Sequence, residues 1–292
     1  MLDKSITDPD HQMAMPFQAA EDYAHTVMAW AQEALPSDVV ATRDLPYGDH
    51  RLQRYNVFAP RGARDAPVLV FWHGGGWTNG YRDYTTFMAP YVTRLGMVLV
   101  APSYRLAPEH PLPAAFEDGL ALLNVLTRNI AALGGVPDRL YLSGHSAGGH
   151  LATLVALRTA EQRNAGLPEK AIRGCLPISG IMDLYHPAPP PASLEERVYT
   201  MVLRTPEEDS VMSPLCWTVG NRLPMLLSYG ERDSERVIRS NRRLLAMLRL
   251  QGGAVAVRVE AGKDHFQTHT SLSDAGHPWY RSLQELVQTG NV

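Results

Sequence analysis

A serine flanked by glycines is the residue of this chain best suited to act as a nucleophile. Residues 144–148 read Gly-His-Ser-Ala-Gly, with Ser146 at the centre. A strand-like run precedes them and an Ala- and Leu-rich stretch follows, which is the setting of a sharp strand-to-helix turn that holds a serine hydroxyl outward. The start of the helix also favours negative charge beside the serine. We therefore predict a nucleophilic Ser146; the alternative is a serine that only caps a helix.

A serine hydroxyl needs a base within hydrogen-bonding reach, and the chain has eleven histidines. Where a serine occupies such a turn, the acid and then the histidine follow it in the chain. His265 lies in a loop after the last strand-like run and fits this order, so it is the predicted base. His269, in the same region, is the second candidate. His150 is expected to pack inside the protein, because it lies four residues along the helix that follows the serine.

The acid is expected after the strand-like run 224–229, where Glu231, Asp233 and Glu235 follow one another. Asp233 lies far enough into the turn to reach the histidine, where a carboxylate would hold the imidazole in the right tautomer and stabilise its charged form. Asp264 is a poorer candidate, because the side chains of adjacent residues usually diverge. The alternative for Asp233 is a cap on the helix that begins at Glu235.

A glycine loop, His73-Gly74-Gly75-Gly76-Trp77, directly follows the apolar run 67–72. Main-chain N–H groups of such a loop, together with the N–H of Ala147, can form an oxyanion hole for an attacked carbonyl. The alternatives are a glycine turn without a ligand and a phosphate loop. A phosphate loop needs Gly-Lys followed by Ser or Thr, and the residues that follow here are Trp77, Thr78 and Asn79.

Strand-like and helix-like stretches alternate along the chain, and they must position these residues. Such alternation predicts an α/β fold with a mainly parallel sheet and helices on both faces. The predicted strands are Leu52–Ala59, Pro67–Trp72, Met97–Ala101, Arg139–Ser143, Gly174–Ser179, Pro224–Tyr229 and Ala254–Glu260. The predicted helices are Phe17–Leu35, Tyr84–Arg94, Ala114–Arg128, Ala147–Gln162 and Glu235–Leu250.

One long connection interrupts this alternation. Residues 186–222 contain a proline-rich stretch and a predicted short helix, Leu194–Leu203. Connections of this length are usually functional or disordered. We predict a single domain over residues 1–292, in which residues 1–40 and 186–222 form a small helical lid; the alternative for the insertion is a mobile surface loop. Trp77, His145 and Trp217 are the predicted substrate contacts, although such residues often only pack.

The composition excludes several other classes of protein. Hydrophobic residues make up 45% of the 292 residues, charged residues 20%, and the net charge is only −3, so neither nucleic acid nor an anionic membrane is an expected partner. No window approaches the roughly 18 apolar residues of a transmembrane helix, and the polar N-terminus does not resemble a secretory signal. Cys175 and Cys216 are expected to be reduced thiols. We expect a cytoplasmic protein without a metal or other cofactor, acting on a small molecule, with a homodimer as one assembly to consider.

Together these motifs resemble the hormone-sensitive-lipase-like branch of the α/β-hydrolase esterases. The matching stretches are HGGGW at 73–77, SYRLAPEHPLPAAFED at 103–118 and GHSAGGHLA at 144–152. The resemblance implies the α/β-hydrolase fold and hydrolysis of a small carboxylic ester through an acyl-enzyme intermediate. It also implies a catalytic triad of Ser146, Asp233 and His265, and an oxyanion hole formed by Gly75, Gly76 and Ala147.

Two positions depart from that branch and resemble the kynurenine-formamidase group. Members of the branch usually carry Asp before the serine, where this chain has His145, and Asp-Pro-Leu at the acid, where it has Asp233-Ser234-Glu235. The formamidase group has a similar His-Gly-Gly-x-Trp loop and a similar Gly-Glu-x-Asp-Ser turn. The substrate therefore stays open between a carboxylic ester and an N-formyl or N-acyl aryl amide.

Two other classes of function compete with a serine hydrolase. His265 and His269 have a four-residue spacing that can bind zinc, with Asp264 or Asp274 nearby, but a metal would leave the serine turn unexplained. A non-catalytic binding protein on the same fold is the other class. Such proteins normally lack a member of the triad, whereas all three residue types are present here in the expected order.

Overall fold

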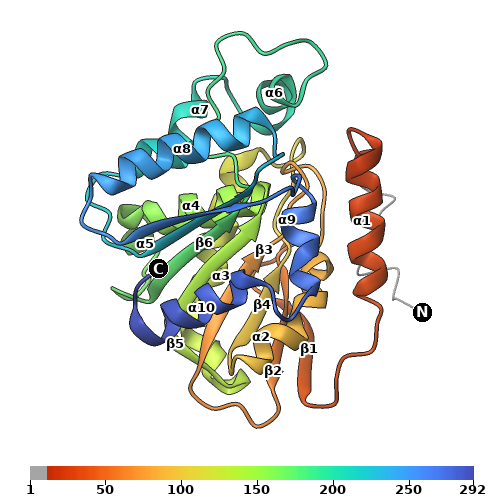
Figure 1. Cartoon of the computed structure of the whole chain (residues 1–292), viewed down its shortest axis with the longest axis vertical. Coiled ribbons are helices and arrows are strands. Elements are labelled where there is room, and N and C mark those ends of the chain that lie inside the picture. The colour runs from red at the N-terminus through yellow and green to blue at the C-terminus, as the bar shows by residue number, and fades with distance from the viewer. Residues whose placement is uncertain (1–11) are drawn as a thin grey trace.

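The structure is a computed structural model that describes residues 12–292. Its centre is an eight-stranded sheet with the order β1-β2-β4-β3-β5-β6-β7-β8. In the described chain, β2 runs opposite to its neighbours β1 and β4, and the other strand pairings are parallel. Figure 1 shows helices on both sides of this sheet. The predicted mainly parallel α/β architecture is confirmed.

Seven of the eight strands coincide with predicted ones to within a few residues, and β1 was not predicted. The sequence of β1, VVATRDLP, is mostly exposed and has no apolar alternation, because the strand lies at the edge of the sheet. The strands are β1 (Val39–Pro46), β2 (Arg54–Pro60), β3 (Ala66–Trp72), β4 (Val98–Pro102), β5 (Gly135–His145), β6 (Ile172–Ile178), β7 (Met225–Gly230) and β8 (Val255–Glu260).

The helices fall into long ones that pack on the sheet and short ones in the connections. None of those within residues 12–292 is both long and apolar enough to cross a lipid bilayer. The α-helices are α1 (Gln18–Trp30), α2 (Ala89–Arg94), α3 (Leu112–Asn129), α4 (Ala147–Leu157), α5 (Thr159–Asn164), α6 (Leu194–Arg197), α7 (Glu208–Val211), α8 (Glu235–Arg249), α9 (Gln267–Thr270) and α10 (Pro278–Thr289). The 3₁₀ helices are η2 (Arg82–Met88), η3 (Ile130–Leu133), η5 (Pro214–Trp217) and η6 (Ser271–Ser273), and η4 (Val198–Val202) is a short π-helix.

The central strands send alternate side chains into two hydrophobic cores, one on each face of the sheet. In β3, Val68 and Val70 join the core that contains α3, α4 and α8, whereas Leu69 and Phe71 join the core that contains α1, α2 and α10. All four side chains are fully buried. Strands covered on both faces need apolar residues at every position, which accounts for the unbroken run PVLVFW.

Three predicted helices differ from the observed ones. The predicted helix Ala147–Gln162 is wrong as a single element, because it breaks at Arg158 into α4 and α5. The Gln162 side chain turns back and donates to the carbonyls of Val155 and Ala156, which ends α4. The first half of the predicted helix 84–94 is the 3₁₀ turn η2, and the predicted helix 194–203 is a single α-turn followed by η4.

Two glycines allow α4 to begin directly against the sheet. A Cβ on Gly148 would lie 2.1 Å from the carbonyl oxygen of Trp72, and one on Gly144 would lie 2.5 Å from the main chain of Gly148. These are the outer glycines of the Gly-x-Ser-x-Gly pattern. The backbone packing at the turn therefore requires glycine at both positions.

Replacing Gly148 with alanine should lower the free energy of unfolding by about 3 kcal/mol, the upper end for overpacking, because the contacting atoms belong to the main chain. Urea denaturation measures this loss. Gly276→Ala is the control, since its Cβ would meet only the Asp274 side chain, at 3.3 Å. Equal stability of the two variants would contradict the steric explanation.

Candidate active site

The structure brings Ser146, Asp233 and His265 together at the carboxyl ends of the parallel strands. Ser146 lies between β5 and α4, Asp233 follows β7, and His265 follows β8. His265 Nε2 is 2.8 Å from Ser146 Oγ, and His265 Nδ1 is 2.8 Å from Asp233 Oδ1. A hydroxyl, an imidazole and a carboxylate bonded in this order have the geometry that a nucleophile, a base and an orienting acid would need.

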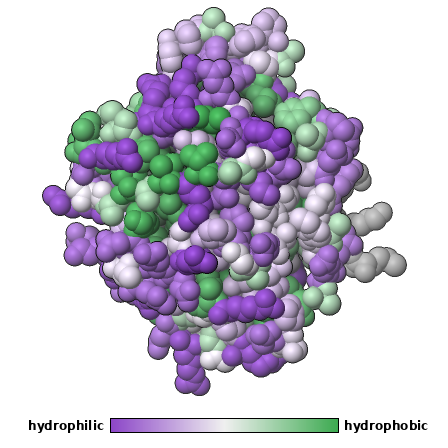
Figure 2. All heavy atoms as spheres, viewed as in Figure 1, coloured by the Kyte–Doolittle hydropathy of each residue, from purple (hydrophilic) through white to green (hydrophobic). Residues whose placement is uncertain are grey.

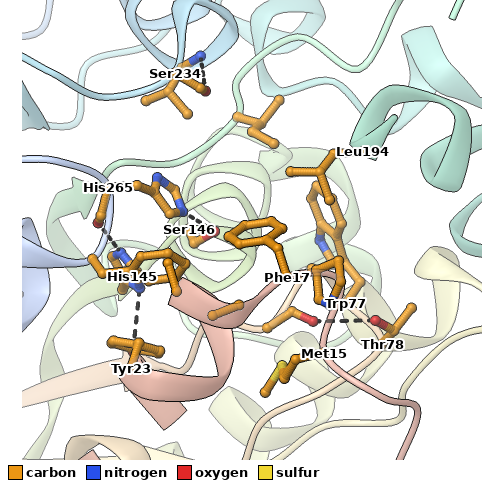
Figure 3. A pocket seen from close by; sticks show the side chains of 18 of the residues that line it. Met15, Phe17, Tyr23, Trp77, Thr78, His145, Ser146, Leu194, Ser234 and His265 are labelled. Atoms are coloured by element: carbon orange, nitrogen blue, oxygen red, sulfur yellow. Dashed lines mark hydrogen bonds between the residues drawn. The ribbon is translucent and has the colours of Figure 1, made fainter. Parts of the chain in front are cut away.

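The Ser146 backbone has φ 55° and ψ −119°, in a region that residues with a side chain rarely adopt. The strained turn is held in place by the Ser146 N–H, which donates to the carbonyl of Ile178 on β6 at 2.9 Å. The serine hydroxyl is thereby presented to the cavity above the sheet (Figure 3). Strain of this kind persists only where the surrounding structure fixes it, and it gathers at functional sites.

The hydrogen-bond partners of His265 determine its tautomer. A carboxylate only accepts hydrogen bonds, so His265 Nδ1 carries the proton that reaches Asp233, and Nε2 is free to accept from the Ser146 hydroxyl. Burial alone would raise the pKa of Asp233, but the hydrogen bonds that the carboxylate accepts from His265 and from the Ser234 N–H hold that pKa below its ordinary value. The N-cap of α8 is Ser234, whose Oγ accepts from the Val237 N–H, so Asp233 does not have the capping role that was its alternative.

The glycine loop lies beside the serine. Gly75, Gly76 and Trp77 all have positive φ, and a Cβ on Gly74 would be only 3.2 Å from Ser146 Cβ. In the part of the chain that the structure describes, the N–H groups of Gly75 and Gly76 donate to no protein acceptor. Ala147 is the first residue of α4, where N–H groups lack a partner within the helix. These three N–H groups can therefore receive a ligand oxygen.

The serine opens into a largely apolar cavity of about 350 Å³ (Figure 3). Trp77 and His145 line it, as predicted for substrate contacts, although His145 is buried and hydrogen-bonded on both ring nitrogens. Trp217 does not line this cavity. Its indole lies over the Arg158 guanidinium at 4.3 Å, and its N–H donates to the Val211 carbonyl. The prediction that Trp217 contacts substrate is therefore wrong, because the η5 turn directs the ring to α4 and α5.

Most of the chain matches a known protein family. The sequence profile of the alpha/beta hydrolase fold family matches residues 69–268, which contain the glycine loop, the serine turn, Asp233 and His265. The chain belongs to this family. The predicted α/β-hydrolase fold and the predicted resemblance to its hormone-sensitive-lipase-like branch are confirmed.

Similar proteins include esterases and a formamidase. Carboxylesterase NlhH of Mycobacterium tuberculosis is 36% identical over 42% of this chain and 40% of that protein, and esterase LipQ of the same organism is 29% identical over 77% and 56%. This α/β hydrolase thus spans about half or less of the length of these two relatives. Kynurenine formamidase of Danio rerio is 24% identical over 84% of this chain and 81% of that protein. The crystal structure of EstE1, a thermophilic carboxylesterase from a metagenomic library, matches 96% of this chain and 98% of that one, with a TM-score of 0.75 and 24% identity.

Two segments outside the central sheet complete the cavity of this α/β hydrolase. Met15 and Phe17 precede α1, whereas Leu194 and Val198 belong to the insertion 186–222. Residues 1–11 of the predicted lid lie outside the described residues. The two segments were predicted from the sequence, but these side chains were not; the available signals were the amphipathic pattern of residues 17–35 and the predicted short helix Leu194–Leu203.

The N-terminal segment and the insertion are both bonded to the loop that follows the glycines. The Gln12 side chain accepts from the Gly80 N–H and donates to the Gly80 carbonyl, and the Asn79 side chain donates to the Met13 carbonyl. From the other side, Arg197 donates to the Thr78 hydroxyl at 3.1 Å. The walls of the cavity are therefore connected to the predicted oxyanion loop.

Two further histidines that follow Ser146 in this α/β hydrolase have partners other than the serine. His269 is fully buried and bonds Tyr23, and His150 bonds Trp77 and the Met212 carbonyl, as expected for a packing residue. Because His265 and His269 have different partners, the two rings are not arranged around a shared ligand. Among residues 12–292, a group close enough to share a metal ion is formed by His50, Glu109 and His110, outside the cavity lining. His50 Nδ1 accepts from the Leu52 N–H, so its Nε2 carries the proton and donates to His110.

Buried neutral histidines should make the hydrolase sensitive to acid. Burial lowers the pKa of His73 and His150 to about 4 and that of His269 to about 3. Between these values and about 6.5 the unfolded chain binds protons that the folded chain does not, so stability falls as the pH falls. The expected loss is about 1 kcal/mol per histidine for each pH unit below 6.5. Urea denaturation at pH 7, 6 and 5 measures it, and an unchanged midpoint would contradict the prediction.

Proposed function

We propose that this α/β hydrolase cleaves a small carboxylic ester through an acyl-enzyme intermediate on Ser146. The observation that carries the proposal is the pair of 2.8 Å hydrogen bonds that joins Ser146 to His265 and His265 to Asp233 beside an apolar cavity. A hydroxyl so placed can lose its proton to Nε2 as it attacks a carbonyl.

The proposed reaction has two halves. In the first, Ser146 Oγ bonds to the carbonyl carbon, its proton moves to His265 Nε2, and the oxyanion is bound by the N–H groups of Gly75, Gly76 and Ala147. The imidazolium, stabilised by Asp233, then protonates the leaving alkoxide as its bond to carbon breaks. In the second half, water gives a proton to His265 and adds to the acyl carbon, and Ser146 recovers its proton as the carboxylic acid leaves.

The size and lining of the cavity support a small substrate. A volume of about 350 Å³ is close to the lower limit of ligand pockets, which begin at about 300 Å³. Apolar side chains such as Phe17, Trp77 and Leu194 surround the serine (Figure 3). A short acyl chain or a single aromatic ring would bury its apolar surface against them.

Residues 1–40 and the insertion 186–222 are proposed to act as a lid on the single domain. The proposal is supported by Phe17, Leu194 and Val198, which line the cavity from these two segments. A lid that covers the bound substrate would exclude bulk water and strengthen the hydrogen bonds to the oxyanion.

Hydrolysis of an N-formyl or N-acyl aryl amide is the second candidate function. It is favoured by the likeness to the Danio rerio formamidase, which extends over most of both chains. The residues Gly230-Glu231-Arg232-Asp233-Ser234 also read as the acid turn of that group. The same serine and histidine would act, and His265 would protonate a leaving arylamine.

Rates on a short-chain p-nitrophenyl ester and on N-formylkynurenine, measured side by side, test the two candidates. The proposal expects the ester to reach a kcat/KM of at least about 10⁴ M⁻¹s⁻¹, the lower end for enzyme substrates. If only the formamide reaches that value, the second candidate replaces the first. Activity on neither, or activity that survives in Ser146→Ala, would refute the serine mechanism.

A homodimer through the edge of the sheet is also proposed. Figure 2 shows apolar atoms gathered over β8 and the end of α8, where Met247, Leu250 and Val259 are exposed. β8 is the last strand in the sheet order, so one side of its backbone has no strand partner among the described residues. Unpaired edges of this kind can pair with a second chain. Light scattering at several protein concentrations, with Val259→Lys as the disrupting variant, tests the assembly.

A further inference from the structure

The hydroxyl of Tyr23, on α1, lies between two buried imidazoles near the active site. Its oxygen is 2.8 Å from His269 Nδ1 and 3.4 Å from His145 Nδ1. The two rings are stacked, with centroids 5.0 Å apart and an interplanar angle of 11°. All three side chains are buried, and Figure 3 shows Tyr23 and His145 pointing toward each other from α1 and the serine turn.

The other nitrogen of His145 fixes the direction of every bond in this group. His145 Nε2 is 2.8 Å from the main-chain carbonyl of His265. A carbonyl only accepts, so Nε2 carries the proton. Burial and the neighbouring His265 and His269 hold the pKa of His145 well below its ordinary value, so the ring is neutral and Nδ1 is an acceptor. Tyr23 must then donate to His145 and accept from His269 Nδ1.

These bonds end on the main chain of the proposed base. The His265 carbonyl accepts from His145 Nε2 and also from the Thr268 hydroxyl at 2.7 Å, so both of its lone pairs are used. His145 is the residue directly before Ser146. One imidazole therefore connects the turn that carries the nucleophile to the loop that carries the base.

We propose that His145, oriented by Tyr23, is a positioning residue that holds His265 at the correct distance from Ser146. This rests on the proposed serine mechanism. The loop after β8 leaves the sheet before His265, and the bond to its carbonyl ties that loop to β5. Proton transfer requires close alignment, and a displacement of about 1 Å can cost about 100-fold in rate.

The test compares two substitutions of His145 that differ in one donor. Gln places an N–H close to the position of Nε2, whereas Met has similar bulk and no donor. His145→Met should lower kcat for the p-nitrophenyl ester at least about 10-fold, since a loosened base loses part of the benefit of alignment, while KM changes little. His145→Gln should recover most of the loss. Tyr23→Phe keeps the ring and should give a smaller, severalfold loss, because the hydrogen bond that it removes from His145 is long.

Rates are divided by the number of sites that a fluorophosphonate labels, so that misfolded protein does not count. His277→Met is the control: this buried imidazole caps α10 and lies outside the cavity lining, so it should change stability but not kcat. Equal kcat in His145→Met and the native enzyme would overturn the proposal, and so would equal losses in the Met and Gln variants. If His145→Met does not fold, an unchanged kcat in Tyr23→Phe overturns it. Failure of the serine mechanism itself would appear separately, as activity in Ser146→Ala.

Discussion

Replacement of Ser146 by alanine is expected to reduce kcat on the ester by about 10⁴- to 10⁶-fold, the range seen when a serine nucleophile is removed. The variant keeps the cavity and the glycine loop but has no oxygen 2.8 Å from His265 Nε2. No acyl-enzyme can then form, and the remaining rate comes from binding and the oxyanion hole. Steady-state kinetics measure the kcat of the variant, and labelling with a fluorophosphonate measures the reactivity of Ser146 in the native protein.

The matched control is Ser143→Ala, on β5 just before the turn that carries Ser146. The Ser143 hydroxyl is buried and donates to the Leu176 carbonyl at 2.7 Å. Its loss should cost about 1 kcal/mol of stability and leave kcat per labelled site near the native value. A fully active Ser146→Ala, or a native protein that the reagent does not modify, would contradict the assignment of the nucleophile.

Asp233→Asn is expected to lower kcat by about 10⁴-fold, as for the equivalent change in a serine triad. An amide N–H directed at His265 Nδ1 would favour the tautomer with its proton on Nε2, and that nitrogen could no longer accept from Ser146. The hydrogen bond between Asp233 and His265 also lowers the pKa of the Asp233 carboxyl, which is the interaction that this substitution removes. Because the wrong tautomer affects the chemical step, KM should change far less than kcat.

Asp118→Asn provides the comparison for the loss of a buried carboxylate elsewhere. Asp118 is buried and pairs with Arg105 at 2.7 Å. This variant should be less stable than the native protein but should keep its kcat per labelled site. If both Asn variants lost activity only in proportion to their folded fraction, Asp233 would have a structural role and no part in orienting the base.

The residues proposed for the chemistry could be predicted because each follows a recognisable strand. Ser146, Asp233 and His265 come directly after β5, β7 and β8, and parallel strands bring their carboxyl ends to the same edge of a sheet. The pattern of strands and following polar residues was therefore sufficient to predict which three side chains come together and at which edge of the sheet. Trp217 was predicted from its residue type alone: it lies in the long insertion and not directly after a strand, and its orientation depends on contacts with Arg158.

What could not be predicted depends on contacts between distant parts of the chain. The break between α4 and α5 follows from the side-chain bonds of Gln162, although the propensity of the segment favours one continuous helix. The bond between Tyr23 and His269 joins residues 246 positions apart. Periodicity identified the helix that carries Tyr23, but it contains no information about which loop that helix contacts.

That long separation affects the order in which the candidate site can be assembled during synthesis. Tyr23 leaves the ribosome when residues 265–269 have not yet been made, so α1 can pack on η2 early but must wait for nearly the whole chain before Tyr23 can bond His269. Contacts this distant in sequence form late, because the entropy of closing a long loop must be lost before the contacts stabilise the chain. A nascent chain that already has its first parallel strands would still lack one wall of the cavity and the hydrogen bonds that α1 contributes beside the base.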